Sequence, residues 1–361
     1  MKVAILHDYF AKKGGGERLV LGLAKGLKAD IYTGFVDRAN TFEEINQYNV
    51  TEIGRPMPAG LQTVYLMRKF KQLQLSGYGL YIFSGTMCIT AAEHLKPNLL
   101  YCHTPPRFMY DLYDWFMQNT PFLQRMLLKA LIWYCKPKDQ HYMRQFDKIM
   151  VNSDHVKKRL LDYYGKEVHD KDDVVYSLID LAKFKYKKDG DFYLSYGRLD
   201  PLKRVDVIVR AFQQMPNKKL IVCSGGPSLA EIKELAKGYA NIDVKGYVSD
   251  KELTDLLGSC IATIYLPINE DMGLTPIESN AAGKPCIAAN EGGPKELVKE
   301  GKTGLLIEAS EENLIKAVKK LTPAKAKSMR KDCEAWGKTF SEKAFVDKVK
   351  KVIKSMGLHI T

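Results

Sequence analysis

The chain has 361 residues, of which 45% are hydrophobic and 27% are charged. This composition excludes a disordered or fibrous protein, and the length leaves room for two domains with separate cores. The net charge of +13 favours anionic partners such as phosphorylated substrates, anionic lipid or nucleic acid.

Seven cysteines are scattered along the chain without a C-x-x-C pair. We expect buried thiols in a reducing compartment, and neither a disulfide framework nor a zinc site. Met1-Lys2 leads directly into an apolar strand without a signal peptide, and no apolar run approaches the roughly 20 residues that span a bilayer. These features predict a cytoplasmic protein, either free or peripheral on the inner face of the cell membrane.

The first half of the chain alternates short apolar strands with helical patterns. A strand at Lys2–Leu6 is followed by Gly14-Gly15-Gly16 and by a predicted helix over Glu17–Leu27. Glycines let the backbone approach a ligand closely, and the helix N-terminus favours an anion. A simple flexible turn is the alternative, and the spacing is not the G-x-G-x-x-G dinucleotide fingerprint. Further strands are predicted at Leu80–Phe83, Leu99–His103, Ile149–Asn152 and Val174–Ser177, an alternation typical of a parallel α/β sheet.

His103 ends one of these strands, within the run Tyr-Cys-His-Thr-Pro-Pro-Arg. A polar residue at a strand end, followed by a proline-stiffened loop, is a candidate for a binding site. A buried structural histidine is the alternative.

Two segments of the first half, 55–75 and 117–146, combine basic and apolar side chains. At 100° per residue, Arg125, Lys129 and Lys136 fall within about 40° of each other on a helix. Beside this basic stripe lies a broad apolar face. We expect such a helix to lie at an anionic membrane surface, and the alternative is a core helix with ordinary solvated charges.

The polar segment 183–190 is predicted to be a linker, after which a second α/β series begins. Its strands are expected at Phe192–Tyr196, Leu220–Ser224, Ile242–Lys245, Ala262–Leu266, Cys286–Ala289 and Leu305–Ile307. The last 30 residues are predicted to be helical, with a break near Trp336-Gly337.

Two cations, Arg198 and Lys203, occur on the loop after the first of these strands. Two fixed cations on such a loop can stabilise the negative charge of a phosphorylated ligand without a metal ion. The alternative is a pair of surface cations at a helix start.

Residues 270–278 read Glu-Asp-Met-Gly-Leu-Thr-Pro-Ile-Glu, with two carboxylates on either side of a turn. The flanking strand and helix would bring both carboxylates to the carboxyl edge of a parallel sheet, where α/β proteins bind ligands. A capping box, with Thr275 as N-cap and Glu278 at N3, is an alternative for Glu278. It does not explain Glu270 or the later Gly292-Gly293-Pro294.

The ordered run from Glu270 to Glu296 resembles the E-x7-E block and GGP loop of family-4 glycosyltransferases, which are retaining enzymes of the GT-B fold. The run 101–113 resembles the O-antigen mannosyltransferase branch. The resemblance implies an α/β protein with two Rossmann-like domains whose parallel sheets face each other across a cleft. The expected domains are 1–182 for the acceptor and 191–339 for the donor, with a helix at 340–361 that packs back onto the first.

The resemblance also implies roles for particular residues. The Arg198 and Lys203 side chains would bind the donor diphosphate, Glu278 the ribose, and Glu270 the sugar hydroxyls or reaction centre. Tyr247 would stack on the base, or else pack in the core. The expected catalytic residues are His103, Arg198, Lys203 and Glu270. The expected donor-site residues are Gly15, Gly16, Arg198, Lys203, Gly246, Tyr247, Val248, Glu270, Met272, Gly273, Leu274, Thr275 and Glu278.

Met272 stands where the family usually has Phe, so packing under the sugar should differ.

The resemblance implies transfer of a hexose to a lipid-linked saccharide or glycolipid at the cytoplasmic membrane face. GDP-mannose is the expected donor and UDP-sugars come next. Retention is attributed to a front-face, ion-pair-like displacement, so we expect no covalent nucleophile, no metal and no cofactor.

Two other functions fit parts of the sequence. A GT-B phosphorylase or epimerase would share the fold and the phosphate loops. A non-catalytic nucleic-acid or anion-binding protein would explain the charge, but the chain has no RNA-binding aromatic motif or helix-turn-helix. We therefore expect no nucleic-acid partner.

Overall fold

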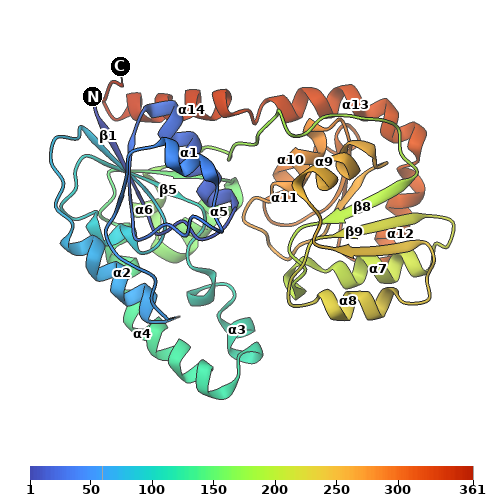
Figure 1. Cartoon of the computed structure of the whole chain (residues 1–361), viewed down its shortest axis with the longest axis horizontal. Coiled ribbons are helices and arrows are strands. Elements are labelled where there is room, and N and C mark those ends of the chain that lie inside the picture. The colour runs from blue at the N-terminus through green and yellow to red at the C-terminus, as the bar shows by residue number, and fades with distance from the viewer. Residues whose placement is uncertain (59, 361) are drawn as a thin grey trace. The chain divides into compact units, whose positions relative to one another are not determined.

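The computed structural model describes residues 1–58 and 60–360. It divides into two compact units (Figure 1). Unit 1 comprises Met1–Ser177 and Phe345–Thr361, and unit 2 comprises Leu178–Ala344.

Unit 1 contains a seven-stranded parallel sheet in the order β3-β2-β1-β4-β5-β6-β7. The strands are β1 (Val3–His7), β2 (Asp30–Thr33), β3 (Val50–Glu52), β4 (Leu80–Ser84), β5 (Asn98–Cys102), β6 (Lys148–Val151) and β7 (Asp172–Val174). The helices are α1 (Gly15–Leu27), α2 (Leu61–Gln72), α3 (Tyr113–Asn119), α4 (Phe122–Met143), α5 (Asp154–Tyr164), α6 (Lys166–His169) and, from Phe345 on, α14 (Glu342–Ser355). The strand order reverses between β1 and β4.

The predicted strands at β4, β5 and β6 are confirmed to within one residue at each end, whereas β2 and β3 were missed. Strand β2 mixes Asp30 and Thr33 with apolar residues, and β3 is a partly exposed edge strand. Neither therefore carries the continuous apolar run that marks a buried parallel strand. Strand β7 ends at Val174, where the predicted strand begins, so that prediction was displaced toward the C-terminus.

Helix α14 packs against the elements of unit 1 through a close helix contact. A Cβ on Gly26 of α1 would lie 2.3 Å from Val346 Cγ2, so glycine is needed for this approach. The Phe345 ring meets the buried Tyr101 ring edge-on at 5.9 Å. These contacts attach the C-terminal helix to the unit that contains the N-terminus.

Unit 2 contains a six-stranded parallel sheet in the order β10-β9-β8-β11-β12-β13. The strands are β8 (Phe192–Tyr196), β9 (Lys219–Cys223), β10 (Ile242–Gly246), β11 (Thr263–Tyr265), β12 (Cys286–Ala289) and β13 (Gly304–Ile307). The helices are α7 (Val205–Gln213), α8 (Leu229–Ala236), α9 (Asp250–Ser259), α10 (Thr275–Ala281), α11 (Pro294–Leu297), α12 (Glu311–Lys320) and α13 (Pro323–Lys338). All six strands were predicted, and the order reverses between β8 and β11.

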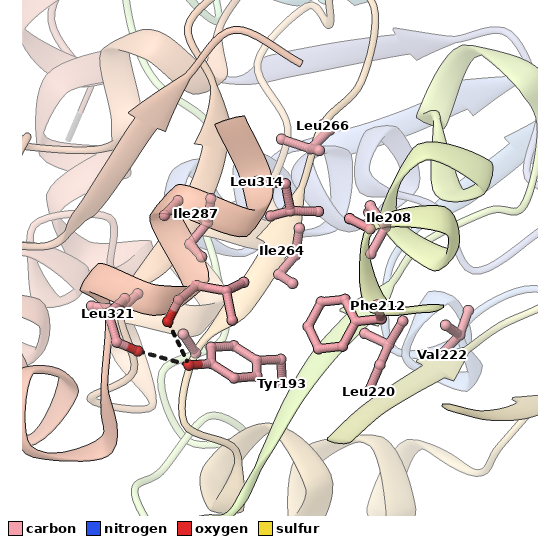
Figure 2. Close-up of a cluster of buried hydrophobic side chains, with 14 of the residues drawn as sticks. Tyr193, Ile208, Phe212, Leu220, Val222, Ile264, Leu266, Ile287, Leu314 and Leu321 are labelled. Atoms are coloured by element: carbon pink, nitrogen blue, oxygen red, sulfur yellow. Dashed lines mark hydrogen bonds between the residues drawn. The ribbon is translucent and has the colours of Figure 1, made fainter. Parts of the chain in front are cut away.

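The core of unit 2 is shown in Figure 2, where apolar side chains from β8, β9, β11, β12, α7 and α12 interlock. Tyr193 is fully buried among them, and its hydroxyl donates to the carbonyls of Val318 at 3.2 Å and Leu321 at 2.8 Å. A buried hydroxyl needs such partners. Tyr193 therefore ties β8, a central strand of the sheet, to the end of α12.

Segment 183–190, predicted to be a linker, is fastened along unit 2. The backbone N–H groups of Lys187 and Lys188 bond to Gly258 O, and Lys284 Nζ donates to Lys188 O at 2.6 Å. The Tyr186 ring has the Arg330 guanidinium 3.4 Å from its centroid. The segment is thus part of the packing of unit 2.

The break predicted near Trp336-Gly337 is confirmed to within two residues, because α13 ends at Lys338 and α14 begins at Glu342. A Cβ on Gly337 would lie 2.5 Å from Ala281 N. This glycine lets α13 approach α10 and does not end the helix. All seven cysteines are buried and free, as predicted.

We expect Tyr193→Phe to lower the free energy of unfolding by about 1–3 kcal/mol, because two buried carbonyls lose their donor. Urea denaturation measures the difference. Tyr239→Phe, at an exposed position of the same unit, serves as the control. Equal stability of the two variants would mean that the Tyr193 hydroxyl contributes nothing.

Candidate active site

The predicted donor loops lie at the point where the strand order of unit 2 reverses. Loop 197–204 follows β8, and the segment with Glu270 follows β11, the neighbouring strand. Ile268 N donates to Leu202 O at 2.8 Å, which joins the two loops directly. This is the edge at which open parallel sheets bind ligands.

Lys203 and Glu270 form an ion pair at this edge, and each side chain is 20% exposed. Lys203 closes a short 3₁₀ turn whose first amide, Leu202 N, donates to the Asp200 carboxylate at 3.0 Å. Its ammonium also lies 5.8 Å from the centre of the Tyr265 ring. Lys203 is therefore held in place. The Arg198 side chain, by contrast, is 73% exposed, and its Nε lies 3.8 Å from Asp200 Oδ2, which is too far for a hydrogen bond.

The Gly292-Gly293 loop supports the backbone of Glu270. Gly293 N donates to Glu270 O at 2.8 Å, and a Cβ on Gly292 would lie 2.6 Å from the same oxygen. An ion pair between Arg204 and Glu291 joins this loop to the residue after Lys203. Gly292 and Gly293 therefore let their loop lie against the segment that carries Glu270, and the ion pair joins it to the loop that carries Lys203.

The structure excludes the alternative for Glu278, a capping box over Thr275–Glu278. Leu274 is the N-cap of α10, and no side chain caps this helix. The Glu278 carboxylate instead accepts a hydrogen bond from the Tyr196 hydroxyl at 2.9 Å. Burial raises the pKa of Glu278 to about 6, although the Tyr196 hydrogen bond opposes the shift. Glu278 is thus oriented by the end of β8 and not by its own helix.

Between the two glutamates the chain turns sharply. Gly273 has φ +79°, which favours glycine, and Met272 is 3% exposed. Met272 therefore packs beneath this turn. Leu274 and Thr275 complete the turn into α10.

The loop Gly246-Tyr247-Val248 presents an exposed aromatic ring. Tyr247 is 79% exposed, so it is not a core residue. It lies over Gly225, where a Cβ would come within 2.1 Å of the ring. Because Leu199 N donates to Gly225 O, Tyr247 belongs to the same strand edge as the Arg198 loop.

In unit 1 the predicted residues also meet where the strand order reverses. His103 Nε2 lies 2.9 Å from Ser84 Oγ, and the carbonyl of Ser84 lies 2.5 Å from His7 Nδ1. A Cβ on Gly16 would lie 3.7 Å from the His103 ring. The start of α1 and the ends of β1, β4 and β5 therefore converge on His103.

Two acidic residues at this edge were missed. The Asp8 carboxylate accepts hydrogen bonds from the backbone N–H groups of Thr86, Met87 and Cys88 at 2.7–2.9 Å, and so fixes the loop after β4. Glu17 is 4% exposed and forms no side-chain hydrogen bond or ion pair within the described residues. The sequence offered one signal for each residue: Asp8 directly follows a strand, and Glu17 lies in the first turn of α1.

Helix α4 has an exposed apolar face, and in Figure 1 it projects with α3 from unit 1 away from the strands. The large side chains on this face are 37–80% exposed: Phe122, Leu123, Met126, Leu127, Trp133 and Tyr134. At 100° per residue they span about 140°, with Lys129 and Lys136 along one border. The opposite side of α4 buries Ile132 and Cys135. The apolar face is therefore not part of the core of unit 1.

Within residues 1–58 and 60–360, no group of three His, Cys, Asp or Glu side chains is arranged to hold a metal ion. None of the helices in this part of the chain is long and apolar enough to cross a membrane.

Burial, with a smaller effect of nearby His7, lowers the pKa of His103 from 6.5 to about 4. Between these values the unfolded chain binds more protons than the folded chain, so the free energy of unfolding should rise with pH over this window. We expect a rise of up to about 3 kcal/mol, since one pKa unit corresponds to about 1.4 kcal/mol. Urea denaturation from pH 4 to 7 should show that His103→Gln removes this rise and that the same change at exposed His359 does not. An unchanged pH dependence in His103→Gln would contradict the assignment of this rise to His103.

Comparison with known proteins agrees with this geometry. Residues 179–343 match the family described as glycosyl transferases group 1. The chain is 25% identical to human alpha-1,3/1,6-mannosyltransferase ALG2, covering 85% of this chain and 84% of the relative. It is 27% identical to the Saccharomyces cerevisiae protein of the same name, covering 79% and 69%.

Solved structures share the whole fold. Anabaena Alr3699/HepE in complex with UDP and glucose matches with a TM-score of 0.75 and 16% identity, over 98% of this chain and all of that chain. Sucrose-phosphate synthase from Thermosynechococcus elongatus matches with a TM-score of 0.77 and 16% identity, over 99% of both chains. Residues 179–343 thus match the group 1 glycosyl transferases, and the protein is a glycosyltransferase whose two Rossmann-like units have the GT-B fold.

Proposed function

We propose that this glycosyltransferase moves mannose from GDP-mannose to a lipid-linked saccharide or glycolipid, with retention of the anomeric configuration and without a metal ion. The observation that carries the proposal is the convergence of Lys203, Glu270 and Glu278 on one strand edge of unit 2. This edge lies in the part of the chain that matches the family.

In this proposal Arg198 and Lys203 bind the donor diphosphate. Lys203 can exchange its contact with Glu270 for the diphosphate, which leaves the Glu270 carboxylate to accept hydrogen bonds from the sugar. Glu278 takes the ribose hydroxyls, and the exposed Tyr247 ring stacks on the base. The turn from Met272 to Thr275 closes around the sugar, while Gly246 and Val248 complete the base site.

The reaction would proceed on one face of the sugar. The bond from C1 to the diphosphate oxygen breaks, and its electron pair leaves with the diphosphate, whose charge the two cations stabilise. The acceptor oxygen then bonds to C1 and passes its proton to the departing diphosphate oxygen. We assign Gly15 and Gly16 to the diphosphate and His103, neutral near pH 7, to the sugar.

The assignment of mannose rests on the relatives named as mannosyltransferases and on the run 101–113. Similar structures contain UDP or UDP-glucose, so UDP-sugars are the second donors to test. The family match favours transfer over the phosphorylase, epimerase and nucleic-acid hypotheses.

We propose further that α4 attaches the enzyme to an anionic membrane at its cytoplasmic face. Six large exposed apolar side chains lie beside Lys129 and Lys136 on this helix. An apolar face bordered by basic residues is typical of helices that lie in the membrane interface. The acceptor lipid would then be anchored in the same surface.

Calorimetry with GDP, UDP, ADP, GDP-mannose and UDP-glucose should show selective binding of GDP and GDP-mannose, equal with and without magnesium. Lys203→Ala should weaken this binding about 10- to 100-fold, because a charge-assisted hydrogen bond contributes about 1.5–3 kcal/mol. The control is Lys319→Ala, at an exposed position on α12. The donor site would be refuted by no response to any nucleotide, or by equal binding in the two variants.

Trp133→Ser and Leu127→Ser should each reduce binding to phosphatidylglycerol vesicles about 10-fold or more, because each removes an exposed apolar side chain that membrane contact would bury. Vesicle sedimentation measures this, and GDP affinity should not change. Tyr239→Ser replaces an exposed aromatic residue of unit 2 as the control. If all three variants sediment like the unmodified protein, α4 is not a membrane contact.

A further inference from the structure

Unit 1 carries a depression of about 440 Å³ that the residues assigned above do not explain. We call it the Tyr110 depression. It is lined by Met109, Tyr110, Asp111, Tyr113, Asp114, Ile132, Lys136 and Tyr163. Its volume is within the range of small-molecule sites, which are commonly about 300–1,000 Å³.

The lining combines aromatic rings with charged groups. The Tyr110 and Tyr163 rings stack at 4.5 Å, and Lys136 Nζ lies 4.9 Å from the centre of the Tyr110 ring. Asp111 and Asp114 add carboxylates that can accept hydrogen bonds. A sugar, which has apolar C–H faces and a rim of hydroxyl groups, matches such a surface.

A buried hydrogen-bond network fixes the floor of the depression. Asp139, which is 6% exposed, accepts hydrogen bonds from the hydroxyls of Tyr110 at 2.6 Å and Tyr164 at 2.7 Å. Gln140 Nε2 donates to the Tyr110 hydroxyl at 3.1 Å and to Tyr163 O at 2.7 Å. The two stacked rings are therefore held before any ligand arrives.

The wall of the depression is connected to the residue that follows His103. The guanidinium of Arg159, which is 4% exposed, donates to Thr104 Oγ1 at 2.8 Å and to Asp111 Oδ2 at 3.2 Å. Arg107 donates to the same oxygen at 2.7 Å. The depression therefore adjoins the loop in which we place the sugar-binding histidine.

Lys136 lies at the other side of the depression, toward the exposed face of α4. It borders the apolar face three residues after Trp133, and it forms no ion pair within the part of the chain that the structure describes. An anion held by Lys136 would therefore lie next to a lipid chain anchored along α4. The lining runs from Lys136 to Asp111, and Arg159 connects Asp111 to Thr104.

We propose that the Tyr110 depression binds the phosphate-linked sugar of a glycolipid acceptor, with Lys136 on the phosphate and the tyrosines and Asp114 on the sugar. The proposal rests on the proposed function and names the head group of its acceptor. It distinguishes Lys136, which binds the acceptor, from Lys129, which contributes only to the membrane surface.

Binding is measured by calorimetry without donor, using octyl α-mannoside and α-mannosyl octyl phosphate below their micellar concentrations. The two probes differ by one phosphate. The phosphate probe should bind about 10-fold more tightly, as expected for one charge-assisted contact. Lys136→Gln should abolish this difference, Lys136→Arg should retain most of it, and Asp114→Asn should weaken both probes.

Lys129→Gln is the matched control, because Lys129 lies on the same border of α4 but does not line the depression. Equal affinity of the two probes, or equal losses in Lys129→Gln and Lys136→Gln, would overturn the proposal. So would equally tight competition by dihexanoyl phosphatidylglycerol, which would indicate a phospholipid head-group site. GDP titrated into the same samples tests the donor site separately, so loss of that response identifies a failure of the proposed function instead.

Discussion

The parallel pairing of both sheets is the constraint on which the rest of the structure depends. Parallel strands need crossover connections, so the carboxyl ends of all strands lie along one edge. In unit 2 the order reverses between β8 and β11, and their following loops carry Lys203 and Glu270. In unit 1 it reverses between β1 and β4, where Ser84 meets His103. The same topological rule therefore places the candidate residues within each unit.

Close backbone approach turns this edge into a defined site. The Gly292-Gly293 loop lies against the backbone of Glu270, and the Gly225 loop lies beneath Tyr247. Any side chain at these glycines would push the loops apart. The ion pairs of Lys203 with Glu270 and of Arg204 with Glu291 then join the loops across the edge. Cations and carboxylates are thus balanced locally, although the chain as a whole carries a charge of +13.

In unit 1, helix α4 has two different sides. One side buries Ile132 and Cys135 and lines the Tyr110 depression, and the other exposes Trp133 and its apolar neighbours. The buried side is also held by polar contacts, such as the hydrogen bond from the Tyr110 hydroxyl to Asp139. If α4 lies on a membrane as proposed, the depression would present the acceptor sugar close to the lipid surface.

The sequence by itself determined the alternation of strands and helices, every strand of unit 2, and the loops that carry Arg198, Lys203, Glu270 and Glu278, because short apolar runs and glycine-rich turns are local signals. It did not reveal β2 and β3, whose polar residues hide the strand pattern. Only the tertiary structure decided that Glu278 pairs with Tyr196 and that Tyr247 is exposed. These outcomes depend on which distant segments meet, and the spacing of residues along one segment does not contain that information.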